Sequence, residues 1–467
     1  MKRFVFVSCF ILIVASLALS GGQKEAGKEV AKKATIEFVS QLPEYEARYQ
    51  AVWEVFMKEN PEIDIEMVML NDQDFRVQID SRMAAGTAPE LFGGSGSQQV
   101  GPTKNNYKNF LDIKEIYRYW DRLPGGKDTW LKNSRLELGR EANGIYGLTF
   151  EMTYWWSFLY HRDMAKEAGL GDKYSVKTVD DLRQWLAKWK GYLDSQGLLT
   201  PLDLGAGSCG SWCSGQEFFQ VYAAMEVESL DRLDDVYTGK ASFTDPQWGW
   251  FFEWMKEMVD KKWLPNEWWT RDWEQDMESN NIAKKVPALL HGPWMWQKLE
   301  QANPDVDLTG FPVPTKSGKN RKIKVSPLVP SKYSWASPAN VVDRESFKTG
   351  AFQKALNFWA GPESVKMQVE DWGELTVMEF ESPLEVTSTQ WQEVGAEVGK
   401  GSWADVSFDF NPWGVSQAPH LIPGEADPIL GGQFIFDQVI FVIQGKKSVK
   451  EAQQAIQDQL ERAYDNR

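Results

Sequence analysis

The sequence predicts an α/β protein whose sheets are largely parallel. Strand-like runs at 36–39, 63–69 and 90–92 alternate with helical runs at 45–58 and 75–85. The helical runs carry apolar residues at helical spacing, whereas the second strand alternates apolar and polar side chains. Strands that alternate with helices and end in Gly/Ser-rich loops are typical of parallel sheets.

The alternation resumes later, and 467 residues are enough for two or more domains. The later expected elements are strands at 144–150 and 155–160 and helices at 162–169, 179–191, 346–359 and 448–464. Apolar residues make up 42% and charged residues 25%, which is ordinary for a soluble globular protein. The net charge of -15 argues against nucleic acid or an anionic membrane surface as the main partner, because phosphates would be repelled.

The first 20 residues have the form of a secretory signal. Lys2 and Arg3 precede an apolar run at 4–19, and Ser20 marks a small-residue cleavage site. An uncleaved membrane anchor is the alternative, but the run is shorter than the ~20 apolar residues that span a bilayer. We therefore expect an exported, periplasmic or otherwise extracytoplasmic protein, with a polar, flexible tether at 21–34.

The positions of the three cysteines bear on lipid attachment and on disulfide formation after export. Cys9 lies inside the apolar run rather than at its end, so a lipoprotein signal is not evident. Cys209 and Cys213 lie close together in a Gly/Ser-rich loop, and in an oxidising compartment they are expected to pair, with two reduced thiols as the alternative. No further ligands lie close enough in sequence to suggest a metal site.

Polar and aromatic residues follow two of the predicted strands, where ligands bind in parallel sheets. The candidate ligand contacts in these two loops are Gln41, Glu44, Tyr45, Ser95, Ser97 and Gln98. Ordinary turn chemistry is the alternative for the Gly/Ser-rich loop. No phosphate-binding motif follows it.

Tryptophan occurs 23 times, and aromatic residues reach 13%. A pyranose ring has an apolar face that aromatic rings cover and a rim of hydroxyls that carboxylates and amides satisfy. The composition therefore favours a sugar ligand, although core packing is the alternative for any single tryptophan.

Five segments, in order, together resemble one family. They are FVSQLPEYEARYQAVWEVFMKENPEIDIEM from Phe38, AAGTAPELF from Ala84, IYGLTFEMTYWWSFLYHRDMAKEAGL from Ile145, VPALLHGPWMWQKLEQANPDVDLTGFPVPTKSGK from Val286 and GKKSVKEAQQAIQDQLERAYDNR from Gly445. They are similar to the extracellular solute-binding proteins of ABC importers, in the sugar-binding branch that includes maltose-binding protein. The sequence departs from the family at Tyr160-His161-Arg162-Asp163, where the family usually has tyrosine–asparagine–lysine–aspartate.

The resemblance implies two α/β lobes joined by a hinge of three chain crossings, near Gly147, Pro327 and Gly373. It is a type II-like periplasmic-binding-protein fold. The expected segments are the signal at 1–20, the tether at 21–34, lobe one at 35–147 and 328–373, and lobe two at 148–327 and 374–467.

The resemblance also implies ligand contacts at the cleft between the lobes. Trp294 matches a tryptophan that stacks on sugar in the family, with core packing as the alternative, and Trp296 is expected to face the core. Further candidates lie in a crossing segment, in the loop at 205–219 and near the third crossing: Glu151, Tyr154, Trp155, Trp212, Gln216, Trp372 and Glu374. The tryptophans of 263–273 are expected in a surface connection.

The implied function is that of a monomeric receptor that binds a sugar or oligosaccharide and delivers it to the membrane subunits of an ABC importer, without a cofactor. An alternative is the same fold with a cationic ligand, such as a polyamine or quaternary amine, or with a peptide. A secreted carbohydrate-active enzyme is less favoured. Histidine occurs only at 161, 291 and 420, without metal-ligand spacing, and no nucleophile-elbow motif is present.

Overall fold

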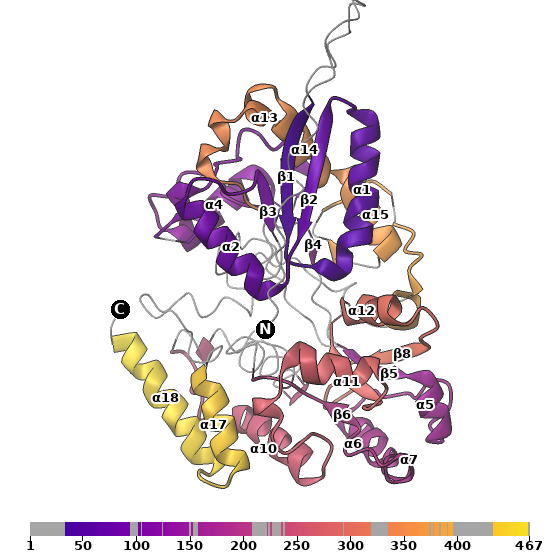
Figure 1. Ribbon diagram of the computed structural model, residues 1–467. Helices are drawn as coiled ribbons and strands as arrows, with labels where there is room; N and C mark the ends of the chain where they lie inside the picture. The colour runs from indigo at the N-terminus through magenta and orange to yellow at the C-terminus, as the bar shows by residue number, and fades with distance from the viewer. Residues whose placement is uncertain are drawn as a thin grey trace, which may run out of the picture.

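A computed structural model shows two lobes, each with a sheet and surrounding helices (Figure 1). It describes residues 33–93, 101–103, 105–123, 125–148, 151–152, 157–207, 222, 225–226, 235–236, 239–292, 294–318, 335–372, 375–376, 378–382, 384–389, 391–395 and 433–465. The predicted signal and nearly all of the predicted tether lie outside these residues. In the described part of the chain, no helix has the length and apolarity needed to cross a membrane.

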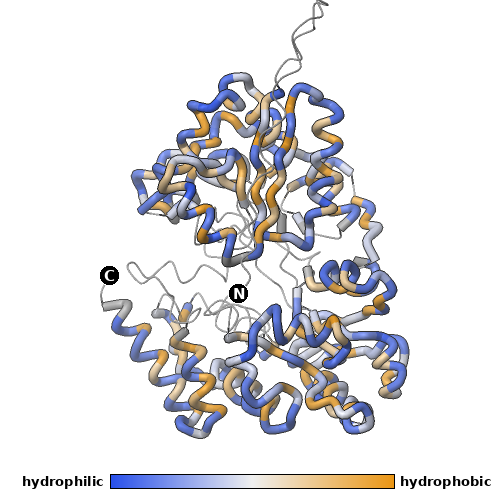
Figure 2. Tube along the Cα trace, viewed as in Figure 1, coloured by the Kyte–Doolittle hydropathy of each residue, from blue (hydrophilic) through white to orange (hydrophobic). Residues whose placement is uncertain are grey.

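The first lobe is built on three parallel strands in the order β2-β1-β3. The strands β1 (Ala34–Ser40), β2 (Ile63–Met69) and β3 (Leu91–Gly93) are connected through α1 (Glu46–Glu59) and α2 (Asp72–Ala84). Figure 2 shows hydrophobic residues along the central strands and polar residues on the outer helices. Because the strands are parallel, their carboxyl ends share one edge of the sheet, and in Figure 1 this edge faces the second lobe.

In the described part of the chain this lobe has four further helices: α4 (Gly126–Leu138), α13 (Glu345–Lys348), α14 (Ala351–Trp359) and α15 (Pro362–Trp372). A single helix was predicted at 346–359, and that prediction is wrong at Gly350. This residue has a φ of 82°, a left-handed conformation that glycine adopts at little cost, and it separates α13 from α14.

Aromatic rings form the centre of the first core. Phe38 of β1 stacks on Trp335 with 4.7 Å between ring centroids, and Trp53 of α1 stacks on Trp359 at 4.9 Å. These contacts join the first strand and helix to chain segments about 300 residues later. The first core therefore contains side chains from segments that are far apart in the sequence.

The second lobe has a four-stranded sheet in the order β6-β7-β5-β8. The strands are β5 (Ser157–His161), β6 (Leu202–Asp203), β7 (Ala288–His291) and β8 (Leu308–Pro312). β6 is parallel to β7, and β5 is antiparallel to both of its neighbours. Three strands thus run in one direction and β5 in the other.

Helices cover this sheet and extend the lobe. They are α5 (Arg162–Glu167), α6 (Val179–Lys188), α7 (Lys190–Gln196), α10 (Pro246–Asp260), α11 (Ser279–Ile282), α12 (Trp294–Ala302), α17 (Gln433–Ile443) and α18 (Val449–Asp465). The helix predicted at 179–191 continues as α7 beyond Gly191, and Gly197, with a φ of 67°, ends it.

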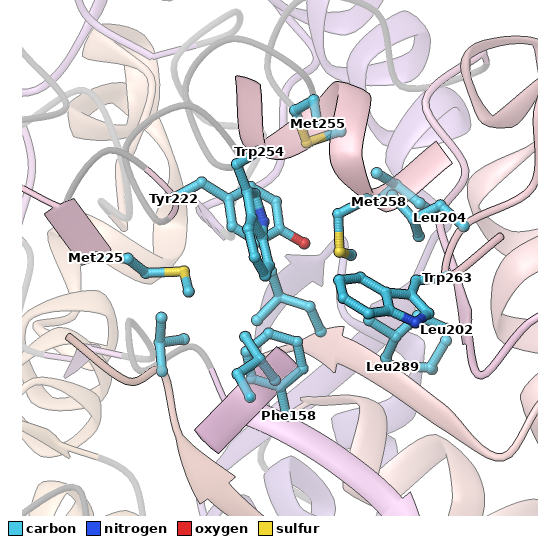
Figure 3. Close-up of a cluster of buried hydrophobic side chains, with 14 of the residues drawn as sticks. Phe158, Leu202, Leu204, Tyr222, Met225, Trp254, Met255, Met258, Trp263 and Leu289 are labelled. Atoms are coloured by element: carbon cyan, nitrogen blue, oxygen red, sulfur yellow. The ribbon is translucent and has the colours of Figure 1, made fainter. Parts of the chain in front are cut away.

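Tryptophans build both cores. Figure 3 shows Trp254 and Trp263 among the methionine and leucine side chains of the second core. Every tryptophan whose side chain is described is buried or half-buried in one of the two cores. The interpretation of 263–273 as a surface connection is wrong, because Trp263, Trp268 and Trp273 belong to the second core. The tryptophan count therefore argues less for a sugar site than the sequence suggested.

The chain passes between the two cores more than once. Residues 36–148 and 335–378 supply the first core, and residues 158–313, 394 and 435–460 supply the second. The short strands β4 (Glu151–Met152) and β9 (Leu375–Thr376) pair with each other in antiparallel fashion. The residues predicted at the second and third crossings are not described, so the exact crossing points stay a prediction.

Candidate functional site

The two lobes meet where the first strand ends. After β1 the chain turns through Gln41 into η1 (Pro43–Tyr45), and the side chains of Gln41, Glu44 and Tyr45 are all buried. The side-chain amide Nε2 of Gln301 on α12 donates a hydrogen bond of 2.6 Å to the backbone carbonyl of Glu44. The predicted ligand loop of the first lobe thus lies on the helix of the second lobe that begins at Trp294.

The carboxyl group of Glu44 belongs to a buried acidic residue. Burial raises its pKa to about 7, and the negative charges of Glu278 and Glu274 act in the same direction. The ammonium group of Lys298 opposes this rise and does not cancel it. Near neutral pH the Glu44 carboxyl is therefore only partly ionised.

A buried carboxylate holds the connection between β7 and α12. One oxygen of Glu278 accepts hydrogen bonds from Trp273 Nε1 at 2.9 Å and from His291 Nε2 at 3.1 Å, and the other accepts from Lys298 Nζ at 2.8 Å. His291 is three residues before Trp294, and Lys298 is four residues after it. Glu278, the last residue of η6 (Trp273–Glu278), therefore fixes both sides of the turn that carries Trp294.

The charges in this cluster stabilise one another. Burial alone would raise the pKa of Glu278, but the hydrogen bond from His291 and the charge of Lys298 lower it to about 2. Burial would lower the pKa of Lys298, yet the Glu278 and Glu44 carboxylates hold it above its usual value. Burial lowers the pKa of His291, so its ring is neutral at pH 7 and its Nε2 carries the proton that Glu278 accepts.

A second polar cluster lies at the end of β6, the parallel neighbour of β7. The buried carboxylate of Asp203 accepts hydrogen bonds from the Arg271 guanidinium at 2.6 Å and from Asn280 Nδ2 at 3.2 Å. Gly205 follows, and a Cβ there would overlap the carbonyl of Asp272. These contacts anchor the start of the loop at 205–219, whose predicted ligand residues lie beyond the described part.

The structure brings together only part of the predicted site. Gln41, Glu44 and Tyr45 lie at the lobe interface. For three candidates the backbone alone is described, in β4, α12 and α15 respectively: Glu151, Trp294 and Trp372. The remaining candidates lie outside the described residues: Ser95, Ser97, Gln98, Tyr154, Trp155, Trp212, Gln216, Glu374, Cys209 and Cys213. Their roles stay predictions.

Sequence reasoning missed the polar residues that follow Trp294. Gln297, Lys298 and Gln301 come three, four and seven residues after it, and this spacing places all four on one face of a helix. The periodicity was present in the sequence and could have identified them.

The profile of the family described as bacterial extracellular solute-binding protein matches residues 51–394, most of the chain. The chain belongs to this family. The members of this family are extracytoplasmic proteins that bind solutes, and they are binding proteins rather than enzymes. No curated protein sequence matches this chain.

Solved structures share the two-lobed fold of this solute-binding protein. A chitin oligosaccharide binding protein is 16% identical, with a TM-score of 0.62 over 92% of this chain and 99% of that one. The GacH receptor of Streptomyces glaucescens, solved unliganded and with acarbose, is 16% identical, with a TM-score of 0.56 over 92% and 98%. The protein RafE in complex with raffinose is 16% identical, with a TM-score of 0.56 over 92% and 100%. At this identity the likeness shows the fold.

Proposed function

We propose that this solute-binding protein is the receptor of an ABC importer and binds a sugar or oligosaccharide between its lobes. The observation that carries the proposal is the meeting of η1 with α12, which joins the loop of Glu44 to the helix that begins at Trp294. Structural neighbours named for a chitin oligosaccharide, acarbose and raffinose support a carbohydrate as the ligand class.

The chemistry of this interface suits a polyhydroxylated ligand. Gln41 and Glu44 offer buried hydrogen-bonding groups, and Tyr45 offers an aromatic ring with a hydroxyl. In the proposed complex Trp294 stacks on the apolar face of the sugar, while amides and carboxylates bind its hydroxyls. The other predicted contacts keep their proposed roles around the same ligand.

The proposed transport cycle uses closure of the lobes. Ligand binds to one lobe, and the second lobe then closes over it, as in other periplasmic binding proteins. Closure requires that both lobes contact the ligand, because only a difference in affinity shifts the equilibrium between open and closed forms. The closed monomer then docks on the membrane subunits of the importer and releases the sugar unchanged.

The proposal also includes export of the protein and the pairing of its cysteines. The segment at 1–20 directs secretion and is removed near Ser20, without lipid attachment at Cys9. In the oxidising compartment Cys209 and Cys213 form a disulfide. Mass spectrometry of the mature, non-reduced protein tests both statements.

A thermal-shift panel tests the function. Mature protein is melted with raffinose, acarbose, chitin and xylan oligosaccharides, amino acids, polyamines and quaternary amines, because a ligand of the folded state raises the melting temperature. We expect a saturable shift with a sugar that is recovered intact, and loss of that shift in Trp294→Ala. Trp250→Ala is the control, since Trp250 is half-buried on α10 in the body of the same lobe.

Each other outcome would indicate a different ligand, activity or binding site. A shift with cationic amines alone would keep the fold and replace the sugar by a cation. Breakdown of an oligosaccharide by the pure protein would identify an enzyme. A shift that survives Trp294→Ala would remove this residue from the site.

A further inference from the structure

Helix α12 has two different faces. Met295, Trp296 and Leu299 point into the core of the second lobe, and all three are buried there. With 3.6 residues per turn, Gln297 lies on the opposite side of the helix. Its side chain is nevertheless only 3% exposed, so something other than the second core covers it.

The first lobe lies against this opposite face. Gln301, one turn after Gln297, donates its hydrogen bond to the backbone of Glu44, and Lys298 acts electrostatically on the Glu44 carboxyl. Trp294, the first residue of α12, is one turn before Gln297 on the same face of the helix. Gln297 is thus buried at the boundary between the lobes, between Trp294 and the contact with η1.

The carboxamide of Gln297 has no hydrogen-bond partner in the described part of the chain. Both its Nε2 and its Oε1 are inaccessible to solvent and unsatisfied. Folded proteins rarely leave both ends of a buried amide without partners, because the desolvation of each polar atom is then uncompensated. Its neighbour Trp296 is satisfied, with Nε1 donating to Glu300 at 2.7 Å.

We propose that Gln297 is a ligand-binding residue. Its side-chain amide forms hydrogen bonds with a pair of hydroxyl groups on the sugar stacked at Trp294. A carboxamide offers one acceptor and one donor group side by side, and two neighbouring hydroxyls match this pattern. A cation would satisfy only the oxygen, and an anion only the nitrogen. The adjacent ammonium of Lys298 also disfavours a cation. The inference rests on the proposed function and names the group that selects a neutral, hydroxylated ligand.

Gln297→Met tests the inference, because methionine has nearly the same shape and makes no strong hydrogen bond. Without ligand the variant should melt about 2–4 °C higher than wild type, since an unsatisfied amide has been removed. Its affinity for the sugar identified in the panel should fall about 10- to 100-fold. Calorimetry with raffinose, acarbose, chitin and xylan oligosaccharides measures the affinity.

Gln453→Met is the matched control in the same lobe. Gln453 is 5% exposed on α18, and its Nε2 donates to the carbonyls of Phe243 and Asp245 at 2.9 and 3.0 Å. This variant should melt lower than wild type and bind sugar with unchanged affinity.

Three results would overturn the proposal. A lower melting temperature for Gln297→Met would show that its amide has a structural partner. Affinity within twofold of wild type would show that it does not contact the ligand. A wild-type protein that binds none of these sugars would refute the proposed function itself, and that result is visible before any variant is made.

Discussion

The buried ion pair between Glu278 and Lys298 makes the sharpest stability prediction. Glu278→Gln keeps the shape of a side chain that is 4% exposed and removes its charge. Lys298, whose side chain is 21% exposed, then lacks its main counterion. Removing one partner of a buried pair costs about 3–5 kcal/mol.

The pKa of Glu278 gives a second, independent value for the free energy that its charge contributes to stability. A pKa of about 2 for Glu278, against a usual value of 4.5, corresponds to about 3 kcal/mol of stability. Because the pKa is lowered in the folded state, this contribution is present above about pH 4.5. It is lost as the pH falls towards 2 and the carboxylate takes up a proton.

Urea unfolding at pH 7 measures the loss. We expect Glu278→Gln to lower the free energy of unfolding of the second lobe by about 3 kcal/mol. Glu274→Gln is the control, because Glu274 lies 3.7 Å from the same ammonium but is 60% exposed, and an exposed pair contributes at most about 1 kcal/mol. The double variant Glu278→Gln/Lys298→Met should recover part of the loss.

Three results would refute this reasoning. A loss below 1 kcal/mol for Glu278→Gln would mean that the pair contributes no more than a surface pair. Strictly additive losses in the double variant would mean that the two charges do not interact. A loss that persists unchanged at pH 2.5 would assign the effect to packing instead of charge.

Three further predictions concern other parts of the molecule. Burial raises the pKa of Glu44 to about 7, so its contribution to stability is full below about pH 4.5 and lost as the pH rises through 7. Glu44→Gln should flatten the melting temperature over this range, and an unchanged slope would contradict the assignment. Trp359→Ala should cost about 3–5 kcal/mol in urea unfolding, because the side chain is fully buried, and a loss below 2 kcal/mol would contradict its central place in the first core. Gly361→Ala should cost about 1–3 kcal/mol, since a Cβ there overlaps the carbonyl of Asn357, and an unchanged free energy of unfolding would contradict the overlap.

Local sequence patterns predicted the strands and helices that lead to and follow the loop of Glu44, but no helix was expected at α12. The strand at 63–69 has the bounds that were expected, and the helix expected at 45–58 begins and ends one residue later. The helix breaks were harder to predict. Gly350 and Gly191 are both glycines within helical runs, yet only Gly350 takes a left-handed conformation. Glycine adopts either conformation at little cost, so the residue type alone does not decide whether the helix continues.

The sequence by itself determined the alternation of strands and helices and the loop after the first strand. These features depend on periodicity and turn chemistry within about ten residues. Only the tertiary structure decided that Glu44 faces Lys298, that Glu278 bridges two residues of another segment, and that Gln297 is buried opposite the core of its own lobe. Such partners lie far apart along the chain, and their pairing depends on which sheet edges the folded lobes bring together. The tryptophan count did not identify the ligand site either. An indole ring packs in a core or on a sugar through the same apolar surface, so composition cannot distinguish the two.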